Sequence, residues 1–356
     1  MAYTTIDKPT DYFNTKTYTG TATSSGDTQA VTGVGFQPDW VWIKNRDGAY
    51  QHVLYDVIRG VNKELRSSQT NAEIDSGTNG YLSAFNSDGF TTTRGTNTGN
   101  HVNANGSGFV SWNWLAGGTA SSNTNGSITS SVSANQDAGF SIVTYDGTGS
   151  AGATVGHGLG VAPSMILAKK MDGAASNWAV YHKSLGATKY LILNSTTASV
   201  TSNTRWNNVE PTSSVFTVGS SGDVNNNGET VVAYCFAEKQ GYSKFGSYTG
   251  NGNADGTFVY TGFKPAFIIH KRTDATGNWN MHDSTRSLIN TADERLYSNL
   301  SNAEDSGGDY GDDILSNGFK IRTTEASWNA SGGSYIYMAF AENPFVTSTG
   351  IPTTAR

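Results

Sequence analysis

The chain is poor in cysteine, proline and charge. Its single cysteine, Cys235, excludes an intrachain disulfide framework and a cysteine-based zinc site. Only 7 prolines accompany 42 glycines, which excludes a proline-rich stalk or a collagen repeat and favours many tight turns. Charged residues make up 15% of the chain, below the roughly 25% that is usual in globular proteins. The surface must therefore be neutral and rich in hydroxyl and amide groups, as is common in secreted and virion proteins.

Basic clusters and long apolar runs are also missing. The net charge is −6 and lysines and arginines are scattered, so we expect no nucleic-acid groove and no anionic-membrane patch. No apolar run reaches the roughly 18 residues of a membrane span. A polar segment follows Met1, from which we expect no signal peptide and synthesis in a cytoplasm. Aromatic residues make up 11%, which is enough to build cores.

One pattern recurs three times along the chain. A Tyr-x-Gly sequence is followed 17 to 20 residues later by a proline, and a lysine lies six residues beyond that proline. About 70 residues beyond the proline comes an apolar-aromatic strand, which we call the closing strand. The three sets are Tyr18, Pro38, Lys44 and 109–114; Tyr145, Pro163, Lys169 and 231–236; and Tyr248, Pro265, Lys271 and 335–340. Internal repetition of this kind predicts three similar structural units.

The repeats predict the domain boundaries. We expect copy 1 over 1–118, a Gly/Ser/Thr/Asn-rich linker over 119–138, copy 2 over 139–239, copy 3 over 240–346 and a solvated tail over 347–356. Within the linker, 127–133 alternates enough to form an edge strand instead. Because only about six residues separate copies 2 and 3, we expect these two to pack as a pair, with copy 1 held more loosely.

Each copy has the pattern of a β-sandwich. The closing strands alternate with period two, and Trp114, Phe236 and Phe340 lie on their large apolar faces. The strand after each proline is apolar on both faces, which is typical of a strand covered on both sides. We expect the lysine that ends this strand to mark its exit to solvent. With about six strands per copy and no amphipathic helix of ten residues, the sequence predicts an all-β fold of three tandem sandwiches.

One segment resembles the start of a calcium loop. It runs from Asp223 to Gly228, but Tyr234, a core strand residue, stands where an EF-hand places its bidentate glutamate. The copies carry an asparagine at this place, with a glycine three residues later: Asn103, Asn225 and Asn329. A turn before the closing strand explains all three copies, whereas calcium explains only the middle one.

Catalytic groups are weakly indicated. The six histidines form no triad, and no nucleophile elbow or phosphate loop is present. Glu73 and Asp75 have the spacing of glycosidase carboxylates but lie in a polar segment, and Glu238 and Glu342 have no acidic counterpart in copy 1. We therefore predict no catalytic residue, no metal site and no cofactor.

Surface recognition is the remaining class of function. Trp178 and Trp279 recur between copies, so we interpret them as caps of the cores. The less regular aromatic residues are better candidates, because a sugar ring stacks on an exposed aromatic face beside amide groups. The predicted ligand-binding residues are Tyr50, Trp206, Asn207 and Trp328.

Four phrases carry a family resemblance: 35–46, 112–118, 155–163 and 242–250. With them, the chain resembles an uncharacterised family of bacteriophage virion proteins that is frequent among marine phages and is usually described as tail-fibre or structural proteins. The resemblance covers about 11–345. It implies lectin-like, jelly-roll or concanavalin-like sandwich units in a virion component, and it supplies no catalytic or ligand residues.

These observations predict a virion protein, assembled in the infected cytoplasm, that acts as a tail-fibre or receptor-binding component and recognises host surface polysaccharide. We expect it to contact other virion proteins and to form a homo-oligomer, a trimer if it is a fibre, whose many weak sites act by avidity. The alternative is a purely structural head decoration or tail adaptor protein. The absence of a coiled-coil heptad pattern favours that alternative.

Overall fold

The computed structural model describes residues 3–75, 77–307 and 311–353. Strands make up 42% of it and helices 3%, which confirms the all-β prediction. The helices in these ranges are single turns: η1 (Pro9–Asp11), α1 (Gly222–Asn225) and α2 (Ala326–Asn329). None of them is long and apolar enough to cross a membrane.

Copy 1 forms two antiparallel sheets, with strand orders β1-β7-β3-β4 and β2-β6-β5. Its strands are β1 (Phe13–Thr19), β2 (Thr28–Thr32), β3 (Trp40–Asn45), β4 (Val53–Asp56), β5 (Tyr81–Asn86), β6 (Gly89–Thr93) and β7 (Gly108–Trp114). Side chains from both sheets, including Val41, Phe90 and Phe109, share one buried cluster.

Copy 2 has a larger sheet, ordered β15-β14-β13-β12-β17-β10-β9-β8, and the pair β11-β16. Its strands are β8 (Ser121–Asn123), β9 (Ser130–Asn135), β10 (Phe140–Asp146), β11 (Ala153–Gly156), β12 (Met165–Lys170), β13 (Ala179–His182), β14 (Lys189–Ile192), β15 (Val200–Thr201), β16 (Val215–Val218) and β17 (Thr230–Phe236). The expected linker 119–138 thus contains β8 and β9, which extend the sheet beyond β10. The alternative of a strand over 127–133 is the better one, but β9 is not an edge strand, because β8 pairs with its outer side. This segment is part of the sheet of copy 2.

Copy 3 has sheets ordered β18-β25-β20-β21-β22 and β19-β24-β23. Its strands are β18 (Ser243–Thr249), β19 (Phe258–Tyr260), β20 (Phe263–Arg272), β21 (Trp279–Asp283), β22 (Leu296–Tyr297), β23 (Asp312–Leu315), β24 (Gly318–Ile321) and β25 (Ser334–Pro344). After β25, 346–353 folds back through a bridge between Val346 and Pro352. The backbone N–H of Ser348 donates to Asp7, so this part of the expected tail lies against the start of the chain.

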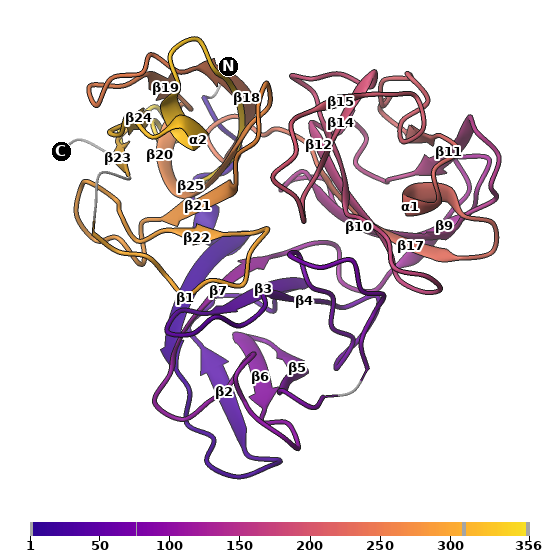
Figure 1. Cartoon of the computed structure of the whole chain (residues 1–356), viewed down its shortest axis with the longest axis horizontal. Helices are drawn as coiled ribbons and strands as arrows, with labels where there is room; N and C mark the ends of the chain where they lie inside the picture. The colour runs from indigo at the N-terminus through magenta and orange to yellow at the C-terminus, as the bar shows by residue number, and fades with distance from the viewer. Residues whose placement is uncertain (1–2, 76, 308–310, 354–356) are drawn as a thin grey trace.

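The three copies surround one shared core. Figure 1 shows three lobes, with the sheets that hold β7, β17 and β25 turned inward and the smaller sheets outward. The large apolar faces of the closing strands meet in the centre in a single cluster that draws side chains from all three copies. Trp114 lies between copies, with its ring centroid 6.5 Å from Phe236 and 5.7 Å from Phe340. The expectation that copy 1 is loosely held is therefore wrong, because its aromatic face completes this core.

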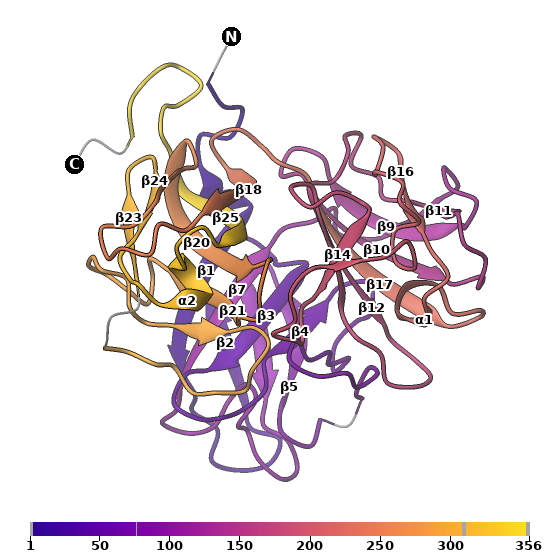
Figure 2. The same ribbon diagram turned by 45° about the horizontal axis from the view of Figure 1, so that its top comes forward.

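Contacts between copies repeat in one direction around the centre. The indole N–H of Trp178 in copy 2 donates to the carbonyl of Arg66 in copy 1 at 2.9 Å. That of Trp279 in copy 3 donates to the carbonyl of Ile192 in copy 2 at 3.0 Å. His52 takes the corresponding place in copy 1, where the contact with copy 3 is made by the Ser67 hydroxyl, which donates to the carbonyl of Ser298 at 2.6 Å. The contacts thus close into a ring, and the turned view in Figure 2 shows copy 1 beneath both other lobes.

The three recurrent lysines correct another expectation. Lys44, Lys169 and Lys271 are fully buried instead of leading to solvent. The ammonium groups of the second and third donate to carbonyls of the preceding copy, those of Thr70 at 2.9 Å and Thr196 at 3.2 Å. Burial lowers the pKa of Lys44 to about 7 and that of the other two to about 8. The neighbouring copy covers the end of the strand, which the sequence of one copy cannot reveal.

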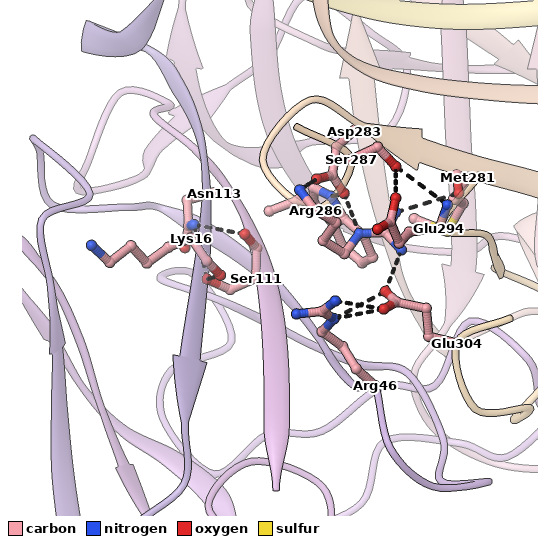
Figure 3. A network of polar contacts seen from close by, with 11 residues as sticks. Lys16, Arg46, Ser111, Asn113, Met281, Asp283, Arg286, Ser287, Glu294 and Glu304 are labelled. Carbon is pink, nitrogen blue, oxygen red and sulfur yellow. Dashed lines mark hydrogen bonds and ion pairs between the residues drawn. The ribbon is translucent and has the colours of Figure 1, made fainter. Parts of the chain in front are cut away.

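Charged groups strengthen the contact between copies 3 and 1. Figure 3 shows Glu304 of copy 3 between Arg46 of copy 1, at 3.0 Å, and Arg286, at 2.8 Å. Arg286 also donates to Asp283 at 2.6 Å, and Asp283 accepts the indole N–H of Trp112 from copy 1 at 3.0 Å. All charges in this network are therefore paired, which offsets the free-energy cost of burying them.

Candidate functional site

Two of the predicted binding residues lie in the interior of the protein. Trp206 is 1% exposed and Trp328 is fully buried. The ring of Trp206 packs edge-on against Tyr181, and that of Trp328 packs against His270. The prediction that these tryptophans offer a ring face to a sugar is wrong, because the short turns that carry them point their side chains into the cores.

The other two predicted residues stay near the surface but do not form a common site. Tyr50 is half-buried in copy 1, where its ring lies over Gly48. Asn207 is half-buried in copy 2 and has a left-handed backbone, with φ of 52°. Neither lines the cleft described below, so the four residues are not brought together.

The other candidate groups have structural partners. The side chain of Asn225 accepts from the backbone N–H of Thr148 at 2.8 Å and donates to the carbonyl of Gly219. These bonds hold the turn before the closing strand that the repeats predict. Asp223 is paired with Arg205 at 2.5 Å. In the ranges that the structure describes, no three His, Cys, Asp or Glu side chains converge as a metal-binding group. The calcium interpretation therefore receives no support from the geometry.

The candidate carboxylates and the cysteine are also accounted for. Glu238 forms ion pairs with Lys183 and Lys244, and Glu342 forms one with Lys264 at 2.9 Å. Burial raises the pKa of the Cys235 thiol, which makes the thiolate unfavourable.

A comparison of the copies singles out copy 3. From Asp283 to Leu296 the chain has 14 residues, whereas the corresponding segments 56–65 and 182–191 have 10 each. Ala292 lies four residues before Leu296, and Ala187 lies four residues before Leu191; both alanines are fully buried. Alignment of the two alanines places the four extra residues of copy 3 at Leu288–Thr291. We call this segment the insertion. Its first two side chains are the most exposed large apolar ones described, with Leu288 at 84% and Ile289 at 79%.

The insertion forms one wall of a cleft of about 780 Å³. The other walls carry mainly hydroxyl and amide groups together with the Lys264–Glu342 ion pair. The lining residues are Lys264, Ser284, Ser287, Leu288, Ile289, Asn290, Ile314, Leu315, Ser316, Asn317, Glu342, Asn343 and Thr353. The side chain of Asn290 binds the backbone of Ile314 in both directions, at 2.9 and 3.0 Å, and so fixes the insertion to β23.

An exposed aromatic pair lies beside the cleft. Phe258 and Tyr260, which we call the aromatic pair, point outward from β19 and are 44% and 53% exposed. At the corresponding positions copy 1 has Ala30 and Thr32, and copy 2 has Thr154 and Gly156. The backbone partner of Tyr260 is Gly318, and the carbonyl of the preceding residue, Asn317, accepts from Thr261 at 3.0 Å. The aromatic pair therefore adjoins the cleft at this turn.

Residues 8–344 match the model of a protein family described as a domain of unknown function (DUF7483). The chain belongs to this family. The match spans the segments that carry all three copies of the sequence pattern. No curated protein and no solved structure gives a significant match to the chain.

Sequence reasoning missed the part of the DUF7483 domain that stands out in the structure. The alternation Phe258-Val259-Tyr260 already places two aromatic residues on one strand face, which is a signal of an exposed aromatic pair that does not depend on tryptophan. The insertion could also have been found by aligning the segment before Leu296 with those before Leu65 and Leu191. The exposure of the insertion could not be predicted, because the apolar residues Leu288 and Ile289 are equally consistent with a buried strand.

Proposed function

We propose that the protein is a bacteriophage virion component of the tail-fibre or receptor-binding class, and that it recognises glycan on the host surface. In this proposal each copy is a β-sandwich of the jelly-roll or concanavalin-like type. The sequence resemblance to virion proteins, the neutral polar composition and the all-β fold support it.

One observation carries the proposal. Among the described residues, copy 3 combines the exposed aromatic pair with a cleft rich in amide and hydroxyl groups. A pyranose ring has an apolar face that stacks on an aromatic side chain and a rim of hydroxyls that bond to amides. Tyr260 would supply the stacking face, and Asn317 and Asn343 lie where rim hydroxyls could be bound.

A shared core suits this role because it fixes the inner sheet of copy 3, whose strands β20 and β25 carry Lys264 and Glu342 of the cleft. The sheet that supports copy 3 packs on the central cluster together with the sheets of the other copies. Side chains that are held in place before binding lose little conformational entropy on binding, although a single open sugar site stays weak. Oligomerisation and many protein copies per particle would then provide avidity.

The second candidate function is a structural one, as a head decoration or tail adaptor protein. The exposure of Leu288 and Ile289 favours it, since an aliphatic pair suits contact with another virion protein better than contact with a sugar. Labelled antibody on intact particles would distinguish a position at a fibre tip from one on the head or at a tail joint.

The test is a glycan array, together with adsorption to whole host cells, using purified protein. We expect Phe258→Ala and Tyr260→Ala each to lower glycan affinity at least tenfold, because each removes a stacking surface. Thr32→Ala is the matched control, since Thr32 is the exposed copy 1 residue that corresponds to Tyr260. Absence of binding to any glycan or host cell at high protein concentration would refute the proposal, as would equal losses in the control.

A further inference from the structure

At three interior positions copy 3 has imidazole or carboxyl side chains, where copy 1 has Ile43, Tyr55 and Leu82. His270 precedes the buried Lys271, and the residues in its place are Ile43 in copy 1 and Ala168 in copy 2. His282 takes the place of Tyr55 and Tyr181. Asp312 pairs with Ile321 of β24, as Leu82 of copy 1 pairs with Thr92 of β6. We call His270, His282 and Asp312 the polar cluster.

All three side chains are fully buried. Nε2 of His270 lies 3.7 Å from Oδ2 of Asp312, beyond hydrogen-bond distance. Within the described residues, neither that nitrogen nor either oxygen of Asp312 has a hydrogen-bond partner. The two imidazole rings stack with centroids 6.3 Å apart, and the Trp328 ring packs edge-on against both.

This arrangement is unfavourable as a simple core. A buried polar group without a partner costs folding free energy. The counterparts in the other copies avoid that cost, because Ile43, Ala168 and Leu82 are apolar. The hydroxyls of Tyr55 and Tyr181 donate to Glu64 and Glu210, at 3.3 and 2.5 Å. Departures of this kind from the consistent pattern of a fold are typical of functional positions. Because the two other copies fold without such a cluster, the cluster is not a requirement of the fold.

The polar cluster is directly connected to the cleft. Asp312 begins β23, and its backbone exchanges hydrogen bonds with Ala292 at 2.9 and 3.3 Å. Ala292 immediately follows the insertion. Two residues further along β23, the backbone of Ile314 is held by Asn290 of the insertion. A shift of β23 would therefore move the insertion.

We propose that the polar cluster is a proton-sensitive switch that keeps the insertion closed near neutral pH and opens it when the protonation of its side chains changes. Opening here means that β23 separates from His270 and that the insertion leaves the cleft wall. The proposal does not depend on what the cleft binds.

The electrostatic surroundings agree with this role. Burial lowers the pKa of His270 to about 3 and that of His282 well below its ordinary value, and it raises the pKa of Asp312. The positive charge of Arg295 further disfavours both imidazolium forms, and that of Arg286 disfavours the second. The charge of Asp313 disfavours ionisation of Asp312. On the other side of the cluster, the Tyr248 hydroxyl lies 3.4 Å from Nδ1 of His270, and the ring of Tyr335 stacks on that of Tyr248.

The signs of these pKa shifts predict a pH at which the population of the open form is smallest. Below about pH 6.5 an opened copy 3 takes up a proton at each imidazole and releases one from Asp312, a net uptake of about one proton. Above that pH only the release from Asp312 remains, so raising the pH also favours opening until the closed form itself loses that proton. The population of the open form should therefore rise by up to about tenfold per pH unit on either side of pH 6.5.

Hydrogen exchange followed by mass spectrometry on the whole chain, between pH 4.5 and 8 and corrected for intrinsic rates, tests this. We expect the amides of 284–295 and 312–315 to exchange most slowly near pH 6.5. Their corrected exchange rate should rise by up to about tenfold per pH unit on either side of that pH. The copy 1 loop 57–65 is the internal control and should show no such minimum. A triple variant with His270→Ala, His282→Tyr and Asp312→Leu, each a residue of another copy, should lose the pH dependence.

Asp312→Asn keeps the size of the side chain and serves if the triple variant does not fold. It should remove the rise above pH 6.5 and steepen the rise below it. A flat profile in the unmodified protein would overturn the proposal, and so would an unchanged profile in Asp312→Asn. Zinc ions that slow exchange in the unmodified protein but not in the variants would overturn it as well, since the cluster would then be a metal site.

Discussion

Substitution of Trp114 by alanine should destabilise all three copies together. The ring of Trp114 contacts Trp40 in copy 1, with centroids 4.4 Å apart, and also Phe236 in copy 2 and Phe267 in copy 3. Removal of a fully buried tryptophan costs about 3–5 kcal/mol, including the cavity that is left. Because the cavity opens in the shared core, no copy keeps an intact inner face.

The size of the temperature shift distinguishes shared from separate unfolding. If the 356 residues unfold as one unit, an unfolding entropy of about 2.1 cal/mol/K per residue gives a decrease in Tm of roughly 4–7 °C. If copy 1 unfolds alone, its roughly 100 residues give a decrease of about 15–25 °C for that transition only. Differential scanning calorimetry should show a single peak that moves by the smaller amount.

Hydrogen exchange supplies the control for this prediction. In Trp114→Ala we expect faster exchange in β17 and β25 as well as in β7. Phe90→Ala removes a buried ring from the separate cluster of copy 1. It should lower the single Tm as well, but the faster local exchange that it causes should be confined to copy 1. A separate early transition in the calorimeter, or exchange in β17 and β25 that matches the unmodified protein, would refute the shared core.

Four further predictions concern single groups. Trp178→Phe removes a hydrogen bond between copies and should lower the free energy of unfolding in urea by about 1–3 kcal/mol. Burial lowers the pKa of His182 to about 4. Because the unfolded chain takes up the proton first, the free energy of unfolding should fall by about 3 kcal/mol as the pH falls from 6.5 towards 4. His182→Gln should flatten this pH dependence of the urea midpoint. Cys235 should react with a thiol reagent only after unfolding, because its side chain is fully buried. Gly147→Ala would place a methyl carbon 2.3 Å from the carbonyl oxygen of Asn226 and should destabilise the protein by more than about 1 kcal/mol in thermal unfolding.

The local pattern predicted the strands and their faces well. Val110, Trp112 and Trp114 share a buried face, as their alternation indicated, and β3 and β12 are buried on both faces. The positive φ of Gly106 confirms a turn before the closing strand of copy 1. These features depend on side-chain periodicity and turn chemistry, which are local properties of the sequence.

The covering of each face could not be predicted in the same way. Periodicity shows that the face of Trp114 is buried but not that Phe236 and Phe340 of other copies bury it. The same limit explains why Lys169 was expected to be exposed, since its partner, the carbonyl of Thr70, lies about 100 residues away in another copy. For the candidate site, the composition indicated surface recognition, but burial of Trp206 depends on packing that one sequence does not encode locally.

The ring of contacts between copies has an evolutionary consequence. In a ring of three identical chains every substitution appears three times, so a costly change is multiplied. Here each copy is encoded separately, and a change such as the gain of Leu288–Thr291 or the placement of Asp312 in a core occurs once. Two copies can therefore stay under selection for packing alone while the third accumulates departures. Within the DUF7483 family, we expect sequences to vary most around β19, β23 and the segment before Leu296.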